Sequence, residues 1–138
     1  LFYQSGEFEK AKASLLNAVS IDKSDLNSRI MLGKVLLKLN NYQEIINLLQ
    51  LSLTDSPDNV QILHLLGLAS YHMGQFSKAT KYLERFLLKQ QDNVEVLNTL
   101  AESWFKLDNA EKARRYWRQS LEIDGNQGDI RRKLEGLK

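Results

Sequence analysis

The sequence predicts an all-helical protein built from a repeated pair of helices. Equivalent residue types recur every 34 positions, and each recurring segment contains two stretches with helical hydrophobic spacing. The chain is also poor in residues that interrupt helices, since its 138 residues include one Pro and seven Gly. It is 43% hydrophobic and 26% charged, with a net charge of +2. This is the balance of a folded globular protein and not of a disordered one.

The period of 34 residues appears in several columns that stay in phase without an insertion. Turn-forming residues recur at this interval at Gly6, Asn40, Gly74 and Asp108. Small residues form two columns, at Gly33, Gly67 and Ala101 and at Ala11, Ala79 and Ala113. Large apolar residues form two more, at Val19, Leu53, Leu87 and Leu121 and at Leu32, Leu66, Leu100 and Leu134. We expect the small residues to lie where the two helices of a unit approach closely, with the large ones filling the remaining space.

Each unit is predicted to hold two amphipathic helices. In the central unit Asp58 and Asn59 begin the first helix, because their short side chains can accept hydrogen bonds from its free amides. Gly74 ends this helix, since glycine readily adopts the left-handed conformation found after helix ends. Apolar spacing resumes at Phe76 and marks the second helix. In chain order the expected helices, or ends of helices, are residues 1–4, 7–21, 25–39, 42–54, 59–73, 76–89, 93–107, 110–123 and 128–137.

These columns resemble the tetratricopeptide repeat, a family with a period of 34 residues. The Leu-Gly pair of the family occurs at Leu32-Gly33 and Leu66-Gly67, with Leu100-Ala101 as a variant. Its Pro column is matched by Pro57, whereas its opening Trp is replaced by Arg29, Leu63 and Leu97. The resemblance covers nearly the whole chain and implies a right-handed superhelix, an α-solenoid of antiparallel helix pairs. It implies no particular function, because such repeats serve many unrelated scaffolds.

The phase of the repeat predicts a single domain, 1–138, made of consecutive units. Residues 1–25 are expected to form a partial first repeat, 26–59, 60–93 and 94–127 three full repeats, and 128–138 a C-terminal capping helix. The capping helix has one apolar face and is otherwise charged, which suits a solvent-facing end. Its apolar residues are Ile130, Leu134 and Leu137.

The N-terminal helix is expected to have an uncovered apolar face. The chain begins with Leu1 and not with Met, so we expect it to be a piece of a longer protein. Leu1 falls near the end of a first helix whose earlier part is missing. Its partner helix carries the apolar residues Phe8, Ala11, Leu15 and Ala18. An upstream repeat or a second copy of the chain could cover this face, so self-association is one alternative.

The sequence contains no recognisable catalytic, cofactor-binding or metal-binding motif. Its two histidines, His64 and His72, are eight residues apart on one predicted helix. At 1.5 Å per residue they lie about 12 Å apart, too far to share one zinc ion. The chain has no Cys, and therefore no disulfide or thiol nucleophile, which fits either side of a membrane. It has no run of about 18 apolar residues, so no membrane span is predicted. We expect a non-enzymatic protein without a cofactor or metal.

The family resemblance implies that the first helix of each unit lines a concave groove that binds a peptide or another protein. The implied groove positions are Asn27, Ile30, Lys34, Leu37 and Lys38, then Gln61, His64, Leu68, Tyr71 and His72, then Glu95, Asn98, Glu102, Phe105 and Lys106. Their mixture of apolar and amide side chains suits an extended or helical peptide. The alternative is that Leu37, Tyr71 and Phe105 belong to the hydrophobic core.

Two narrower functions are disfavoured. Family members that hold the C-terminal carboxylates of heat-shock chaperones use a Lys and an Arg one turn apart on one first helix. The corresponding pairs here are Asn27/Met31, Gln61/Leu65 and Glu95/Thr99, which lack these cations. Nucleic-acid binding would use the basic C-terminal residues Lys112, Arg114, Arg115, Arg118, Arg131, Arg132 and Lys133.

Acidic residues interleave with these cations, and no row of stacking aromatics accompanies them. A solvated face, or a dock for an acidic protein, is therefore the favoured interpretation of the basic end. We expect a scaffold or adaptor that binds another protein. The remaining alternative is a segment that targets or regulates a larger enzyme or assembly factor.

Overall fold

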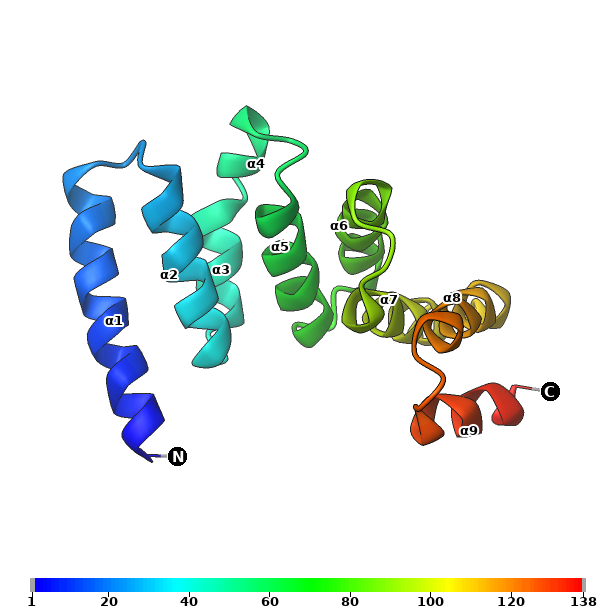
Figure 1. Ribbon diagram of the computed structural model, residues 1–138. Helices are drawn as coiled ribbons and strands as arrows, with labels where there is room; N and C mark the ends of the chain where they lie inside the picture. The colour runs from blue at the N-terminus through cyan, green and yellow to red at the C-terminus, as the bar shows by residue number, and fades with distance from the viewer. Residues whose placement is uncertain (1, 138) are drawn as a thin grey trace.

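The computed structural model describes residues 2–137, which form helices joined by short turns and contain no strand. Figure 1 shows the described helices. They are α1 (Phe2–Ile21), α2 (Leu26–Lys38), α3 (Tyr42–Leu49), α4 (Ser52–Asp55), α5 (Val60–His72), α6 (Phe76–Lys89), α7 (Val94–Lys106), α8 (Ala110–Ile123) and α9 (Gly128–Gly136). The predicted helix positions are reproduced within a few residues, apart from two differences described below.

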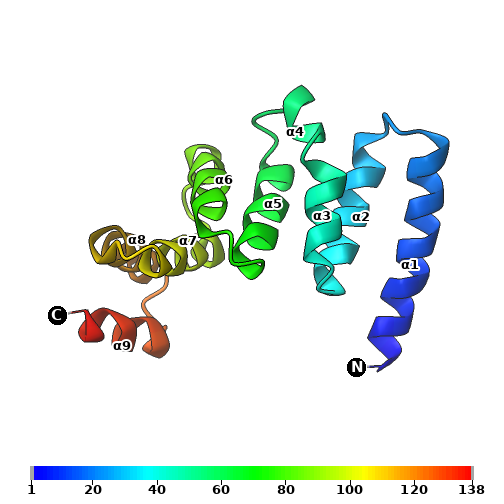
Figure 2. The ribbon, with the colours of Figure 1, turned by 180° about the vertical axis from the view of Figure 1, so that it is seen from behind.

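The helices form antiparallel pairs that stack side by side, so the two ends of the chain lie at opposite ends of the stack (Figure 1). The first helices, α2, α5 and α7, alternate with the second helices, α3, α6 and α8. α2 contacts α1 and α3, α5 contacts α3 and α6, and α7 contacts α6 and α8. Neighbouring first helices also touch, α2 with α5 and α5 with α7. The view from behind brings α3 and α6 in front of α2 and α5 (Figure 2).

The first helices begin with side-chain caps that recur every 34 residues. The side chains of Asp25, Asn59 and Asn93 each accept a hydrogen bond from the amide three residues later. The three distances are 3.3, 3.1 and 2.9 Å. Each bond pairs one of the amides that a helix start leaves without an intrahelical acceptor. Asn59, which the sequence predicts near the start of the first helix in the central unit, is confirmed as a cap.

The turns between the paired helices recur at the same interval. Asn40, Gly74 and Asp108 adopt positive φ angles of 59°, 76° and 61°. Glycine adopts this left-handed conformation without steric cost, and Asn and Asp adopt it more readily than other residues. The chain therefore reverses in the same way at three equivalent places.

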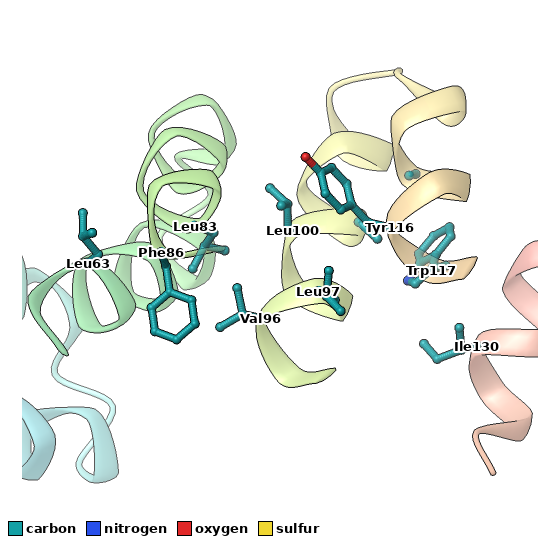
Figure 3. Close-up of a cluster of buried hydrophobic side chains, with 11 residues drawn as sticks. Leu63, Leu83, Phe86, Val96, Leu97, Leu100, Tyr116, Trp117 and Ile130 are labelled. Atoms are coloured by element: carbon teal, nitrogen blue, oxygen red, sulfur yellow. The ribbon is translucent and has the colours of Figure 1, made fainter. Parts of the chain in front are cut away.

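The core consists of two clusters of buried side chains between the helix layers. One joins α5, α6, α7, α8 and α9 (Figure 3), where Phe86 and Val96 approach each other and Trp117 and Ile130 lie toward the C-terminal end. The other joins α2, α3 and α5. Ile45 is the large residue in the column of Ala11, Ala79 and Ala113. Its side chain is completely buried in the second cluster.

The close approach of α5 and α6 depends on Gly67. A Cβ atom added there would lie 2.7 Å from Cγ of Leu83 and closer still to one of its methyl groups. Gly33 is also tight, since a Cβ there would lie 2.9 Å from a methyl of Leu65 and 3.0 Å from a methyl of Leu49. Gly67 thus faces its own second helix, as predicted. Gly33 faces both its own second helix and the next first helix.

The structure corrects the prediction of a turn at Gly6. α1 continues through this residue as one helix, and a Cβ there would meet nothing within 4 Å. Among residues 2–137 the only glycine with a positive φ is Gly74, so Gly6 does not adopt the left-handed conformation of the turns. Between residues 6 and 21 no side chain of α1 is fully buried, although Leu15 and Val19 pack against the second core cluster.

The second difference is a break in the predicted helix 42–54, which the structure divides into α3 and α4. The Arg29 guanidinium donates a hydrogen bond of 2.7 Å to the carbonyl of Leu48. In a continuous helix this carbonyl would accept the amide of Ser52, four residues later. A side chain that enters the backbone ladder in this way interrupts a helix. Arg29 stands where the family's opening Trp is expected, so the departure from the family pattern has a structural consequence.

Candidate protein-interaction face

The implied binding positions lie along one side of α2, α5 and α7, because residues three, four, seven and eleven apart share a helix face. Most retain accessible side chains. Asn27, Lys34, Lys38, Gln61, His72, Glu95, Phe105 and Lys106 are exposed, and Leu37, His64, Tyr71, Asn98 and Glu102 are half-buried. We call this set the first-helix face.

Two implied positions are corrected by the structure. Ile30 and Leu68 are only 5% and 7% exposed. Ile30 belongs to the second core cluster, and Leu68 is enclosed along the buried side of α5. Their side chains therefore contribute to packing between helices and offer little surface to a partner.

The two aromatic residues of the face differ in environment. Phe105 is 44% exposed, although its ring lies 6.0 Å from that of Trp117. Tyr71 is half-buried in a cluster of rings, with centroids 5.2 Å from His72 and 5.8 Å from Phe76. Burial and the negative charge of Glu102 raise the pKa of Tyr71 above its ordinary value of 10.0. Tyr71 is therefore neutral at physiological pH and presents a partly apolar surface.

Polar contacts connect the first helices across the repeats. Nε2 of His64 on α5 lies 2.9 Å from a carboxylate oxygen of Glu95 on α7. The Asn98 amide donates to the side-chain oxygen of Gln127 at 2.8 Å. Lys133 on α9 donates to Glu102 at 3.3 Å. Two residues implied by the resemblance, Asn98 and Glu102, are thus held by contacts with α9 or with the residue preceding it.

The sequence analysis missed Gln127 and Lys133 as neighbours of this face. Gln127 occupies the same 34-residue column as the caps at Asp25, Asn59 and Asn93. Its amide also donates to the hydroxyl of Ser120 at 2.9 Å and so ties the start of α9 to α8. The 34-residue spacing was the signal that could have identified it.

The charges on the face are unevenly distributed. Lys34 and Lys38 on α2 are exposed and take part in no ion pair among residues 2–137. The carboxylates of Glu95 and Glu102 on α7 are each paired, with His64 and Lys133. The end of the face formed by α2 is therefore cationic.

The described residues contain neither a cluster of metal-ligating side chains nor a membrane-spanning helix. No three His, Cys, Asp or Glu side chains between residues 2 and 137 are placed to hold a metal ion. Over the same range no helix combines the length and apolar content needed to cross a bilayer.

Comparison with known proteins supports the repeat architecture. Residues 36–102 match the family model described as tetratricopeptide repeat. Residues 36–102 therefore carry tetratricopeptide repeats. A BBSome complex member, BBS4 of Bos taurus, is 33% identical over 76 residues, which cover 55% of this chain and 14% of that protein. The chain therefore spans only a small part of this curated relative.

Among solved structures, the chain is similar to several forms of MamA. The crystal structure of MamA matches with a TM-score of 0.89 at 14% identity, over 98% of this chain and 79% of that chain. MamA 41-end from Desulfovibrio magneticus RS-1 matches with 0.78 at 18%, over 90% and 70%. MamA of AMB-1 matches with 0.86 at 23%, over 97% and 79%. At these identities the likeness concerns the fold, and it confirms the predicted right-handed α-solenoid of antiparallel helix pairs.

Tetratricopeptide repeats form protein-interaction scaffolds that are typically non-catalytic. A stack of helix pairs presents long rows of side chains at fixed spacing and suits binding better than chemistry on a small substrate. The architecture thus identifies the general role of the chain, an interaction scaffold.

Proposed function

We propose that the chain binds an extended or helical peptide segment of a partner protein on the first-helix face. The observation that carries this proposal is the row of accessible, chemically mixed side chains that recurs on three neighbouring helices. The amide groups and cations on such a row can form hydrogen bonds with the backbone of a peptide. The partly exposed rings can pack against its apolar side chains.

Pre-organisation of the face supports the same function. The contacts of Asn98 with Gln127 and of Glu102 with Lys133 restrict these side chains before a partner arrives. A restricted side chain loses less conformational entropy on binding, so more of the contact energy appears as affinity. By contrast, Lys34 and Gln61 are exposed and form no side-chain hydrogen bond within residues 6–137. They are suited to contacts made only with the partner.

A displayed library of random peptides, selected on the purified chain, tests this proposal. Enriched peptides are then measured by fluorescence anisotropy against Lys34→Ala and Gln61→Ala. Lys81→Ala and Gln119→Ala are matched controls, because they remove the same residue types from exposed positions on second helices. We expect the first two variants to weaken binding by about three-fold or more each. Equal effects of the test and control variants would contradict a site on the first-helix face.

A second candidate function follows from the relative's membership of a complex. BBS4 is by name a member of the BBSome complex, and the chain matches 14% of its length. We infer that the chain can act as one segment of a larger subunit, where it would contribute to assembly. Expression of the tagged chain in its native host, followed by size-exclusion chromatography, tests this inference. Elution of the chain only at the volume of the isolated protein would contradict it.

The exposed side of α1 supports self-association as a further form of this scaffold role. Leu16 and Ile21 are 48% and 78% exposed, whereas the residues expected to be uncovered are half-buried, namely Phe8, Ala11, Leu15 and Ala18. Burial of such side chains against a second copy would gain hydrophobic free energy. Light scattering over a range of protein concentrations tests this interpretation, with Leu16→Glu as the variant. A chain that stays monomeric at every concentration excludes it.

A further inference from the structure

The C-terminal helices carry an excess of cations that the chain itself does not neutralise. α8 and α9 contain seven basic residues, Lys112, Arg114, Arg115, Arg118, Arg131, Arg132 and Lys133. Within residues 2–137 only Lys133 among these seven forms an ion pair, with Glu102 on α7. Guanidinium groups without a carboxylate partner are available to an anionic ligand.

Two of these guanidinium groups are held in place by backbone carbonyls. Arg114 on α8 donates to the carbonyl of Leu137 at 3.2 Å. Arg131 on α9 donates twice to the carbonyl of Gly125, at 3.2 and 2.7 Å. Each group keeps further N–H donors, since a guanidinium carries five. Fixing its position reduces the entropy lost when a ligand binds.

A cleft of about 250 Å³ lies between α8 and α9 beside these groups. Its lining consists of Arg114, Arg118, Leu121, Arg131, Leu134 and Glu135. The two leucines are half-buried against the first core cluster and give the cleft an aliphatic floor. Arg118 is exposed and makes no side-chain hydrogen bond or ion pair within residues 2–137. The cleft thus combines three cations with an apolar surface.

We propose that this α8–α9 cleft binds an acidic peptide segment of a partner protein, with an aliphatic side chain seated on the two leucines. Arg118 and its neighbours would pair with carboxylates, because the planar guanidinium matches a carboxylate with two parallel hydrogen bonds. The Glu135 carboxylate can accept a hydrogen bond from a backbone amide of the peptide. The cleft lies on helices other than those of the first-helix face, so this is a second docking surface that is independent of the first.

The chemistry of the cleft favours a peptide over a nucleic acid. Bases bind proteins of this kind by stacking on exposed aromatic rings. The rings on α8 are enclosed, since Trp117 and Tyr116 are 2% and 9% exposed. The cleft instead offers aliphatic leucines beside its guanidinium groups. A peptide that alternates carboxylates and aliphatic side chains matches both components.

The test measures fluorescence anisotropy of a short labelled peptide of alternating Glu and Leu, with the whole chain as the binding protein. A Gln–Leu peptide and an oligouridylate of the same length are the comparison probes. Arg118→Gln is the test variant, because Arg118 lines the cleft and forms no side-chain hydrogen bond or ion pair within residues 6–137. Arg132→Gln is its matched control, since Arg132 is a neighbouring exposed cation that does not line the cleft. Lys34→Gln reports on binding to the first-helix face, and circular dichroism verifies that each variant is folded.

We expect the Glu–Leu peptide to bind, and the Gln–Leu peptide to bind at least about ten-fold more weakly. Arg118→Gln should weaken binding of the Glu–Leu peptide about ten-fold, whereas Arg132→Gln and Lys34→Gln should change it by less than about three-fold. Added salt should weaken the interaction. The proposal is overturned by equal losses in Arg118→Gln and Arg132→Gln, by a loss confined to Lys34→Gln, by tighter binding of the oligouridylate, or by no saturable binding of the Glu–Leu peptide.

Discussion

Replacing Gly67 by Ala should destabilise the chain, although alanine is the better helix former. The added Cβ would lie 2.7 Å from Cγ of Leu83, whereas carbon atoms in contact prefer about 3.5–4.0 Å. Leu83 would have to move by roughly an ångström, yet it is completely buried against its neighbours. Overpacking of this kind costs about 1–3 kcal/mol, and the gain in helix propensity returns about 0.8–1.0 kcal/mol. The net loss should be on the order of 1 kcal/mol.

Gly6→Ala is the matched control for this substitution. Gly6 also lies inside a helix, but a Cβ there meets nothing within 4 Å, so the variant should gain up to about 1 kcal/mol. Urea denaturation followed by circular dichroism measures both values. Equal stabilisation by the two substitutions would refute the close approach of α5 and α6.

A double-mutant cycle with Leu83→Ala isolates the contact itself. Leu83→Ala alone should cost about 2–5 kcal/mol, because it leaves a cavity in the first core cluster. In the double variant the methyl group at residue 67 no longer meets the leucine, so the combined cost should be smaller than the sum. The expected coupling is on the order of 1–2 kcal/mol, and strict additivity would contradict it.

Two further predictions concern backbone conformation and pH. Gly74→Ala should destabilise the chain by about 1–2 kcal/mol, because φ is 76° there. The loss is one of backbone conformation, since an added Cβ would have no atom within 4 Å. Urea denaturation that shows no loss of stability would contradict the left-handed turn. At Asp25, hydrogen bonds from the hydroxyl and then the amide of Ser28 lower the pKa of the carboxyl below 3.8. Its stabilising effect is therefore complete above pH 3.8 and lost as the pH falls through the lower folded-state pKa. Denaturation of Asp25→Asn in the same acidic range should lack this part of the decline, and an identical pH profile would exclude the mechanism.

The helix caps and turns could be predicted from the sequence because they depend on local chemistry that each repeat restates. Asp25, Asn59 and Asn93 need only a short acceptor before a helix, and the left-handed turns need only Gly, Asn or Asp at the reversal. The break between α3 and α4 could not be predicted in this way. It depends on Arg29 reaching the carbonyl of Leu48, nineteen positions along the chain, and on the place of α2 beside α3.

The sequence predicts which helices form the candidate face, but it does not predict the exposure of every side chain on that face. Period and resemblance together select one side of each first helix, and Asn27, Gln61 and Glu95 are indeed exposed there. Burial of Ile30 and Leu68 depends on how far the neighbouring helices overlap, which a helical period alone does not specify. The partners of a charged residue likewise depend on the stagger between adjacent helices.

That stagger can be measured from the polar contacts, and it explains the charge distribution on the first-helix face. His64 pairs with Glu95 and Glu102 with Lys133, and both pairs span 31 positions. A residue on one first helix therefore faces the residue one turn before its equivalent in the next repeat. The same offset from Lys34 and Lys38 leads to Leu65 and Ala69, which are buried and uncharged. The two lysines thus have no carboxylate at the facing position, which leaves their charges available to a partner protein.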